Sequence, residues 1–301
     1  MAKIVIIGSS VAGHTTAVYL SGAGTQSSLT LVTRESCPAY DRRKLPQLIS
    51  GAVKEEELFL CDENFYKEKG IEFLKGKEVI SVNLSKKIVN FKDKESLSFD
   101  FLVVASGASF IEADIPGAKK EGVFLFNGIQ EVKDFSSRAI LDTVCISGCQ
   151  DYALEIGRAI KEKYKVEVKL ISPDCDTAAQ AGENIEIIKG RLQELIGEGQ
   201  VQAVKLESGK VIAASSVIFM DERQPETDFL RNTPLALENG FVKVDENMRT
   251  NIDSVFACGA VCISGSACAG SKNWDEALNE SRILTDTLIK AMRGEPCQRS
   301  W

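Results

Sequence analysis

Two short turns in the chain have the residue types and spacing to hold a phosphate-bearing nucleotide. The first, Gly8–Gly13, reads GSSVAG, and the second, Gly148–Ala153, reads GCQDYA. Each follows a short apolar run and precedes a helical stretch, and each matches G-x-G-x-x-G/A at its first and third positions. At such a junction the unpaired N–H groups and the positive end of the helix dipole attract a pyrophosphate. Both turns are therefore candidate dinucleotide sites.

The first turn is predicted to bind a cofactor. Gly8 would allow the tight turn, and Gly13 would allow the helix to pack closely on the strand. Ser10 replaces the middle glycine, but serine is small and its hydroxyl could bond a phosphate oxygen. Glu35 lies just beyond the apolar run 29–32, where an acid would hold the adenosine ribose hydroxyls. Alternatively, the Gly8–Gly13 turn is purely structural, and Glu35 is a solvated charge in a loop.

The second turn keeps the ends of the motif but not its middle. Gln150 puts a long side chain where the backbone must approach the ligand. The strand at 166–171 ends in Ser-Pro rather than in an acid, and Asp174 could serve only if the loop bends back. Either a nicotinamide dinucleotide binds here weakly and unusually, or this part of the chain has another role.

The chain has nine cysteines. Their odd number and the length of the chain disfavour a disulfide framework, and no C-x-x-C occurs. Most are expected to be small core residues. The alternative is an iron–sulfur or redox site made by Cys258, Cys262 and Cys268, but their spacing matches no common ferredoxin pattern. We therefore predict no metal site.

Both turns need a strand before them and a helix after them. The strand–turn–helix pattern begins near residue 3 and recurs near residue 143, with the two turns 140 residues apart. Two such units predict an α/β fold with two Rossmann-like nucleotide-binding domains. The buried run at 255–258 follows the second unit and is expected to return to the first domain.

Composition narrows the function class. The chain has 301 residues and a formal net charge of −7, with 44% hydrophobic and 26% charged residues. Nothing suggests the basic surface that nucleic acid requires. No apolar run approaches the roughly 20 residues of a membrane-spanning helix, and no leader precedes the first strand. We expect a cytoplasmic protein that binds neither nucleic acid nor membranes.

Several motifs follow one another along almost the whole chain: IVIIGSSVAG (4–13), PAYDRRKLPQLISG (38–51), FDFLVVASGA (99–108), IPGAKKEGVF (115–124), VKVDENMRTNIDSVFACGAV (242–261) and NWDEALNESR (273–282). In this order they resemble the motifs of one superfamily, the FAD-dependent pyridine nucleotide–disulfide oxidoreductases, and within it the rubredoxin reductase and NADH oxidase branch. The resemblance implies the glutathione reductase-like FAD/NAD(P)-binding fold without a C-terminal interface domain.

The resemblance also assigns domains and residues. Residues 1–115 and 241–301 would form the FAD-binding domain, and residues 116–240 the NAD(P)-binding-like domain. Lys44 would act in catalysis by tuning the flavin. The implied FAD-binding residues are Gly8, Ser9, Ser10, Val11, Ala12, Gly13, Glu35, Arg42, Lys44, Val79, Ala105, Ser106, Gly107, Gly259, Ala260, Val261 and Trp274. The corresponding NAD(P) residues are Gly148, Gln150, Ala153 and Glu155.

Several departures from the family pattern bear on these assignments. Ala260 stands where members usually carry an Asp that binds the ribityl chain, which removes a hydrogen bond of about 1.5–3 kcal/mol. Arg43 replaces the usual Pro. The acidic stretch 221–227 (DERQPET) replaces the glycine of G-x-x-P-N-T. The C-x-x-C of thioredoxin reductases is missing, and His14, the single histidine, is expected to be a packed residue rather than a general base.

The resemblance implies an FAD-dependent oxidoreductase that passes electrons between NAD(P)H and a redox-protein acceptor through the flavin. The partner would be an iron–sulfur protein of rubredoxin or ferredoxin type, and a homodimer is compatible with the sequence. The alternative is a flavin-bearing electron-transfer subunit of a larger complex, with a degenerate NAD(P) site. A third interpretation is a flavin-binding structural or sensor protein without turnover.

Overall fold

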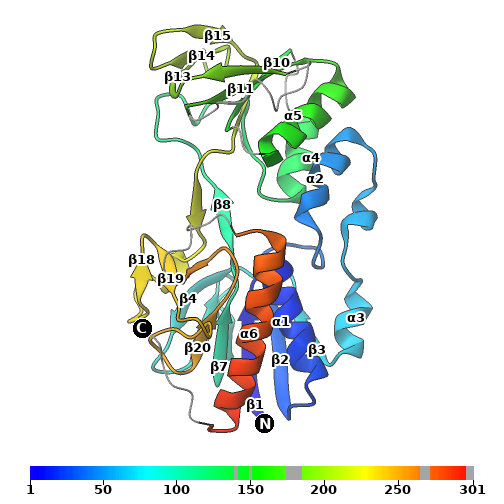
Figure 1. The fold of residues 1–301 in the computed structure, drawn as a ribbon, viewed down its shortest axis with the longest axis vertical. Helices are drawn as coiled ribbons and strands as arrows, with labels where there is room; N and C mark the ends of the chain where they lie inside the picture. Colours follow the sequence, from blue (N-terminus) through cyan, green and yellow to red (C-terminus); the bar gives the residue numbers. More distant parts are fainter. Residues whose placement is uncertain (139–141, 149–150, 174–184, 265–271, 296–301) are drawn as a thin grey trace. The chain divides into compact units, whose positions relative to one another are not determined.

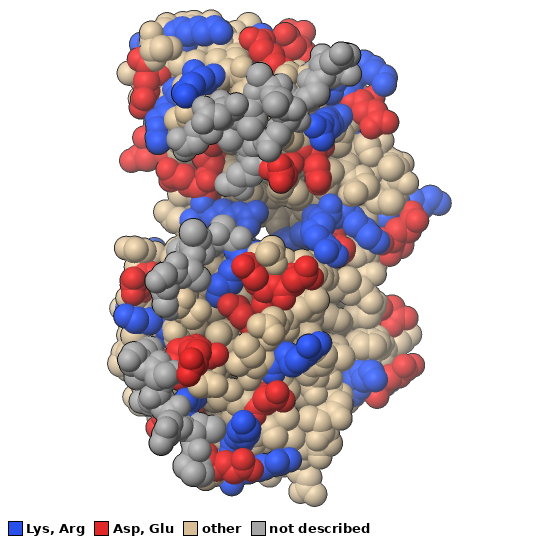
Figure 2. Space-filling model, viewed as in Figure 1, with Lys and Arg blue, Asp and Glu red and all other residues tan. Residues whose placement is uncertain are grey.

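A computed structural model describes residues 1–138, 142–148, 151–173, 185–264 and 272–295 (Figure 1). The chain divides into two compact units. The first unit comprises Met1–Asp41, Phe59–Ala108 and Gln224–Trp301. The second unit comprises Arg42–Leu58 and Ser109–Arg223. Figure 2 shows acidic and basic side chains interspersed over the face in view.

The first unit is built on a parallel five-stranded sheet in the order β20-β7-β1-β2-β3. The strands are β1 (Ala2–Ile7), β2 (Ser27–Val32), β3 (Ile71–Leu74), β7 (Phe101–Val104) and β20 (Val255–Ala257). Helix α1 (Val11–Gly22) packs against helix α6 (Trp274–Met292), and α3 (Glu63–Glu68) packs on β3. Two small sheets complete the unit: β4 (Val79–Asn83), β5 (Ile88–Phe91) and β6 (Ser96–Ser98), and β18 (Leu237–Glu238), β19 (Phe241–Lys243) and β21 (Cys262–Ile263).

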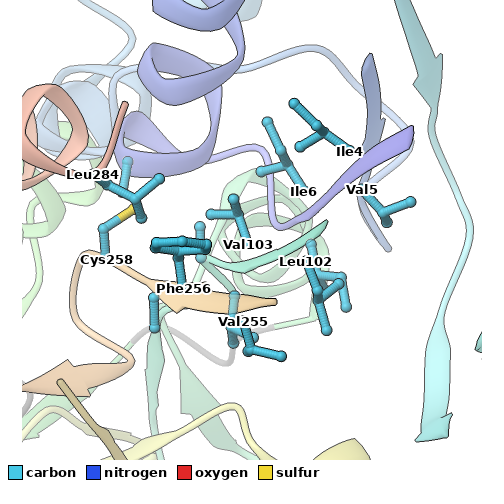
Figure 3. Packing of buried hydrophobic residues seen from close by; sticks show 14 of the residues in the cluster. Ile4, Val5, Ile6, Leu102, Val103, Val255, Phe256, Cys258 and Leu284 are labelled. Carbon is cyan, nitrogen blue, oxygen red and sulfur yellow. The ribbon is translucent and has the colours of Figure 1, made fainter. Parts of the chain in front are cut away.

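The core of the first unit lies at the centre of this sheet. The consecutive residues Ile4–Ile7 of β1 are all buried, because the strand is central and covered on both faces. Figure 3 shows the side chains of β1, β7 and β20 packed together with Leu284 of α6. Because β20 pairs with β7, the run after residue 254 returns to the sheet that carries the first turn, as the sequence predicted.

The second unit repeats the architecture with a parallel sheet in the order β12-β11-β10-β16-β9. Its strands are β9 (Val123–Leu125), β10 (Thr143–Ser147), β11 (Glu167–Ser172), β12 (Glu186–Lys189) and β16 (Ser216–Phe219). Its helices are α2 (Leu45–Ser50), α4 (Ile129–Arg138) and α5 (Asp151–Tyr164). A meander of β13 (Leu192–Ile196), β14 (Ala203–Leu206) and β15 (Val211–Ala213) follows. Strands β8 (Ala108–Phe110) and β17 (Arg223–Pro225) carry the chain between the units.

The bounds of the compact units and of the predicted domains differ in three places. Residues 109–115, predicted in the FAD-binding domain, belong to the second unit. Arg42–Leu58 belongs to the second unit, because α2 packs on α5 and α4. Gln224 onward belongs to the first unit, where the 3-10 helix Asp228–Leu230 packs on β4. Within the described residues, no helix combines the length and the apolar character needed to cross a bilayer.

Candidate functional site

The first turn folds tightly over the end of the neighbouring strand. Gly8 has φ +105°, and a Cβ there would lie 2.2 Å from the carbonyl oxygen of Ala105. A Cβ on Gly13 would lie 1.8 Å from the carbonyl oxygen of Gly8. Only glycine fits at either position, so these residues set the path of the backbone into α1.

The start of α1 is left open for an anion. Ser10 is the N-cap, yet its side chain makes no capping bond, and the first turn of α1 holds no acidic residue. The first N–H groups of a helix have no partner within the helix, and they carry its partial positive charge. This donor set fits the pyrophosphate of a dinucleotide cofactor such as FAD.

Segments far apart in sequence meet at this turn. Ala105 donates its N–H to Ile7 O (2.8 Å), which places Ala105-Ser106-Gly107 beside Gly8. A Cβ on Gly259 would lie 2.9 Å from Cβ of Ala12, so Gly259-Ala260-Val261 lies against the start of α1. Glu35 is half-buried just after β2, with its carbonyl accepting from Gly76 N (2.9 Å).

Two more predicted residues begin elements of the first unit. Val79 is the first residue of β4 and is half-buried. Trp274 is the first residue of α6, whose N-cap Asn273 forms a capping box with Glu276. Asn273 Oδ1 accepts a hydrogen bond from Glu276 N (2.9 Å), and Glu276 Oε2 accepts one from Asn273 N (2.7 Å). This box fixes the start of α6, and with it the position of Trp274.

Arg42 and Lys44 lie in the second unit, in the 3-10 turn that precedes α2. The carbonyl of Arg42 accepts a hydrogen bond from Tyr152 Oη (3.2 Å), and Lys44 Nζ donates to Glu57 O (3.1 Å). In the same unit, Arg223 lies over the ring of Phe110 at 4.2 Å. Burial, together with the nearby charge of Arg42, lowers the pKa of Arg223. The contacts described for Arg42 and Lys44 thus lie within the second unit.

The second turn carries negative charge where the first carries none. Gly148 has φ +132°, and a Cβ there would lie 3.0 Å from Met220 O and 3.4 Å from Oδ1 of Asp221. The hydroxyl of Ser147 donates to the carboxylate of Asp221, and Asp151 stands in the first turn of α5. The Asp221 carboxylate therefore lies beside Gly148, and Asp151 adds a second acidic residue in the first turn of α5.

Two of the other residues predicted for the second turn lie on α5, and two lie outside the described residues. Ala153 is buried and Glu155 is exposed on α5. Gln150 and Asp174 lie outside the described residues. The acidic stretch after residue 220 hinted at the negative charge. The contact between Asp221 and Ser147 had no signal in the sequence, because the two residues are 74 positions apart.

A buried ion pair lies behind the Gly259 loop, and sequence reasoning missed it. Gly259 N donates to Oε2 of Glu280 (2.7 Å), and Lys272 Nζ lies 2.5 Å from Oε1 of the same carboxylate. Lys272 Nζ also donates to Sγ of Cys262 (3.2 Å). The side chains of Lys272 and Glu280 are 6% and 11% exposed. The available signal was that NWDEALNESR (273–282) resembles the family pattern W-x-x-A-x-x-Q-G-R, in which Glu280 stands at the Gln position.

The cysteines of the described residues behave as packing groups. The five of them are outside disulfides, and Cys145, Cys258 and Cys262 are buried. Burial raises the pKa of the Cys145 and Cys258 thiols to about 12, which keeps them neutral. No cluster of three or more metal-binding side chains occurs among the described residues. Cys268, the third residue of the alternative iron–sulfur or redox site, lies outside the described residues.

His14 is packed against aromatic residues on the helix that follows the first turn. Its Nδ1 lies 2.9 Å from Tyr66 Oη, and the Tyr66 ring meets the imidazole edge-on. Burial lowers the pKa of His14 to about 4, and burial raises that of Tyr66 above its ordinary range. Both groups are therefore neutral at pH 7, which agrees with a packed residue.

Comparisons with known proteins agree with this architecture. The family model described as pyridine nucleotide-disulphide oxidoreductase matches residues 2–281. The rubredoxin-NAD(+) reductase of Pseudomonas putida is 26% identical over 306 residues, covering 95% of this chain and 79% of its own length. The ferredoxin–NAD(+) reductase subunit of the benzene 1,2-dioxygenase system of the same organism is 25% identical, covering 97% and 74%.

Solved structures show the same fold. The covalent putidaredoxin reductase–putidaredoxin complex superposes with a TM-score of 0.83 at 20% identity, covering 99% of this chain and 77% of the other. The NADH:rubredoxin oxidoreductase from Clostridium acetobutylicum gives a TM-score of 0.77 at 19% identity, covering 100% and 77%. The predicted α/β fold with Rossmann-like domains is confirmed.

Proposed function

Because the chain belongs to the pyridine nucleotide-disulphide oxidoreductase family, we propose that it is an FAD-dependent oxidoreductase that passes electrons between NAD(P)H and a redox-protein acceptor. One observation carries the proposal: the family match runs through both nucleotide turns, from residue 2 to residue 281. The open N-terminus of α1 supports it, because it supplies the donors that a pyrophosphate needs.

The first unit would bind FAD and the second would bind NAD(P)H. When bound, FAD supplies the two-electron and one-electron chemistry that side chains lack. The residues that would hold it are those of the Gly8–Gly13 turn, Glu35 at the ribose, Val79 at the adenine, Ala105-Ser106-Gly107, Gly259-Ala260-Val261 and Trp274. Gly148, Gln150, Ala153 and Glu155 would serve NAD(P)H.

The side chains of the chain itself would bind and orient. Gly8 and Gly13 bring the backbone N–H groups of α1 to the pyrophosphate, and the Glu35 carboxylate accepts from the ribose hydroxyls. Arg42 would offset phosphate charge, and the Lys44 ammonium would stabilise negative charge on the reduced cofactor. Lys44 is accordingly the proposed catalytic residue.

The acceptor would be a small iron–sulfur protein of rubredoxin or ferredoxin type. Relatives at 25–26% identity are a rubredoxin-NAD(+) reductase and a ferredoxin–NAD(+) reductase subunit, which supports this class of partner. The described cysteines are outside disulfides, which supports a place in a reducing compartment such as the cytoplasm. We propose that, if the protein associates with itself, it forms a homodimer.

A second function is favoured by the carboxylates at the second turn. Asp221 and Asp151 oppose the approach of a pyrophosphate, which suits a flavin-bearing electron-transfer subunit that exchanges electrons with an iron–sulfur protein and makes little use of NAD(P)H. The two functions share the FAD site and differ only in the electron donor.

The test is spectroscopic. Purified protein should be yellow and should release FAD on denaturation, and protein that takes up no FAD would refute both functions. Anaerobic rapid mixing with millimolar NADH or NADPH should bleach the flavin absorbance if NAD(P)H is the donor. Bleaching by a reduced low-potential ferredoxin, but by neither nucleotide, would select the second function.

A further inference from the structure

The buried pair Lys272–Glu280 stands directly behind the segment proposed to meet the cofactor. The Glu280 carboxylate has two partners on opposite oxygens, the N–H of Gly259 at 2.7 Å and the Lys272 ammonium at 2.5 Å. Gly259 in turn lies against Ala12 in the first turn of α1. The pair is therefore linked through one peptide group to the turn that would hold the FAD pyrophosphate.

The Lys272 ammonium keeps its charge despite burial. Burial by itself lowers the pKa of Lys272, but Cys262 and Glu280 outweigh it and raise that pKa above its ordinary value. The lysine is thus a cation at neutral pH. A buried charge pair is costly to desolvate, and a pair of apolar side chains would often be at least as stable. Stability alone is a poor explanation for two buried charges at this place.

The pair also coincides with two departures from the family pattern. Ala260 removes a carboxylate from the segment that follows β20, and Glu280 adds one at the position of a neutral Gln on α6. The carboxylate thus appears 20 residues later in the sequence. In the fold, however, it contacts the residue next to Ala260.

We propose that Glu280 and Lys272 are positioning residues for the flavin cofactor. Glu280 fixes the orientation of the Gly259 peptide, and the buried ammonium balances its charge. The pair thereby sets both the geometry and the electrostatic potential of the Gly259–Val261 segment. The inference rests on the proposed function, since it requires that FAD bind at this segment.

The test measures the midpoint potential of the bound flavin in two variants that remove opposite charges. Glu280→Gln keeps an acceptor for Gly259 N–H but leaves the Lys272 cation unbalanced, so it should favour the reduced, more negative flavin and raise the potential. Lys272→Met leaves the carboxylate unbalanced and should lower the potential. In each case we expect about a tenfold change in the ratio of the affinities for reduced and oxidised FAD, or about 30 mV for two electrons.

Controls separate electrostatics from damage to the fold. The double variant Lys272→Met/Glu280→Gln has no buried charge and should return toward the wild-type potential, and Lys272→Arg should stay close to it. The exposed pair Lys92–Glu78, 2.7 Å apart in the same unit, provides a matched double variant (Lys92→Met/Glu78→Gln) that should leave the potential unchanged.

The outcomes are distinct. Shifts of opposite sign that cancel in the double variant support the inference. Absent shifts, or shifts of one sign in both single variants, overturn it and leave a purely structural pair. If the single variants do not fold, the FAD dissociation constant of the double variant decides: a value equal to that of the wild type overturns the inference, and a changed value supports it. Wild-type protein that binds no FAD would instead refute the proposed function.

Discussion

The two strand–turn–helix units place the same motif under different steric constraints. At the third motif position, a Cβ on Gly13 would lie 1.8 Å from the carbonyl oxygen of Gly8, whereas Ala153 already carries a Cβ and is buried without conflict. At the first position, a Cβ on Gly8 would lie 2.2 Å from Ala105 O, but one on Gly148 would lie 3.0 Å from Met220 O. The first turn is thus the tighter of the two.

The turns also differ in charge. The start of α1 holds no acidic residue and no side-chain cap, whereas Asp151 begins α5 and Asp221 reaches the second turn. The glycine-like ends of the motif therefore determine the backbone path in both copies, while ligand binding depends on residues that can change independently. A Rossmann-type turn is evidence for a fold, and its surrounding charge decides whether an anion can bind.

The largest loss of stability is expected when the glycine at the third position of the first turn is replaced by the alanine that the second turn carries there. Gly13→Ala puts a methyl group into the carbonyl of the same turn and should destabilise the protein by about 3 kcal/mol or more, with loss of FAD. Ala153→Gly, its counterpart, should cost only about 1 kcal/mol. Thermal unfolding and the FAD content of purified protein measure both. Equal losses in the two variants would show that the turns are equally tight.

The second-largest effect is a pH dependence of stability. It comes from the residue after the third motif position, which is His14 in the first turn and Leu154 in the second. The folded-state pKa of His14 is about 4, below its ordinary value of about 6.5. As pH falls from 6.5 to 4, the unfolded chain takes up a proton that the folded chain refuses. Stability present above pH 6.5 is therefore lost, by about 3 kcal/mol, and the loss levels off below pH 4.

Denaturant unfolding at a series of pH values measures this loss. His14→Asn cannot titrate, so the difference between its stability and that of the wild type should change across this window. Carboxylates contribute equally to both proteins and cancel in the difference. A difference that stays constant from pH 7 to pH 4 would show that His14 titrates normally in the fold.

The electrostatic contrast is tested at the second turn. Asp221→Asn keeps an acceptor for the Ser147 hydroxyl and removes a negative charge beside Gly148. We expect about tenfold tighter binding of NADH, because one like charge at contact range costs about 1–2 kcal/mol at a partly exposed site. Asp228→Asn removes an exposed carboxylate in the first unit and serves as the control.

A second variant at this turn, Gln150→Gly, restores the glycine at the middle position of the motif. If the second turn is merely obstructed, this variant should also speed flavin reduction by NADH, and its effect should add to that of Asp221→Asn. Unchanged NADH affinity in both variants would count against an obstructed NAD(P) site and for the electron-transfer subunit.

Local patterns in the sequence predicted the fold and the ends of both turns. Glycine at positions 8, 13 and 148 follows from backbone geometry, and the buried runs of β1, β7 and β20 follow from burial on both faces. Contacts between distant segments carried no such pattern. Ser147 meets Asp221, and Gly259 meets Glu280, only because the sheets bring them together. Likewise, Arg42–Leu58 joins the second unit because α2 packs on α5, which periodicity does not encode.

The smallest effect should come from the middle residue of the first turn. Ser10 is an N-cap whose hydroxyl makes no capping bond, so Ser10→Gly should change the free energy of unfolding by only a few tenths of a kcal/mol. If the hydroxyl does donate to a phosphate oxygen, the FAD dissociation constant should rise by about threefold to tenfold, as for one ordinary hydrogen bond. Titration of apoprotein with FAD measures this, and Ser85→Gly, in an exposed turn of the first unit, is the control. An unchanged constant would mean that the backbone N–H groups of α1 alone hold the pyrophosphate, and that serine at this position is tolerated only for its size.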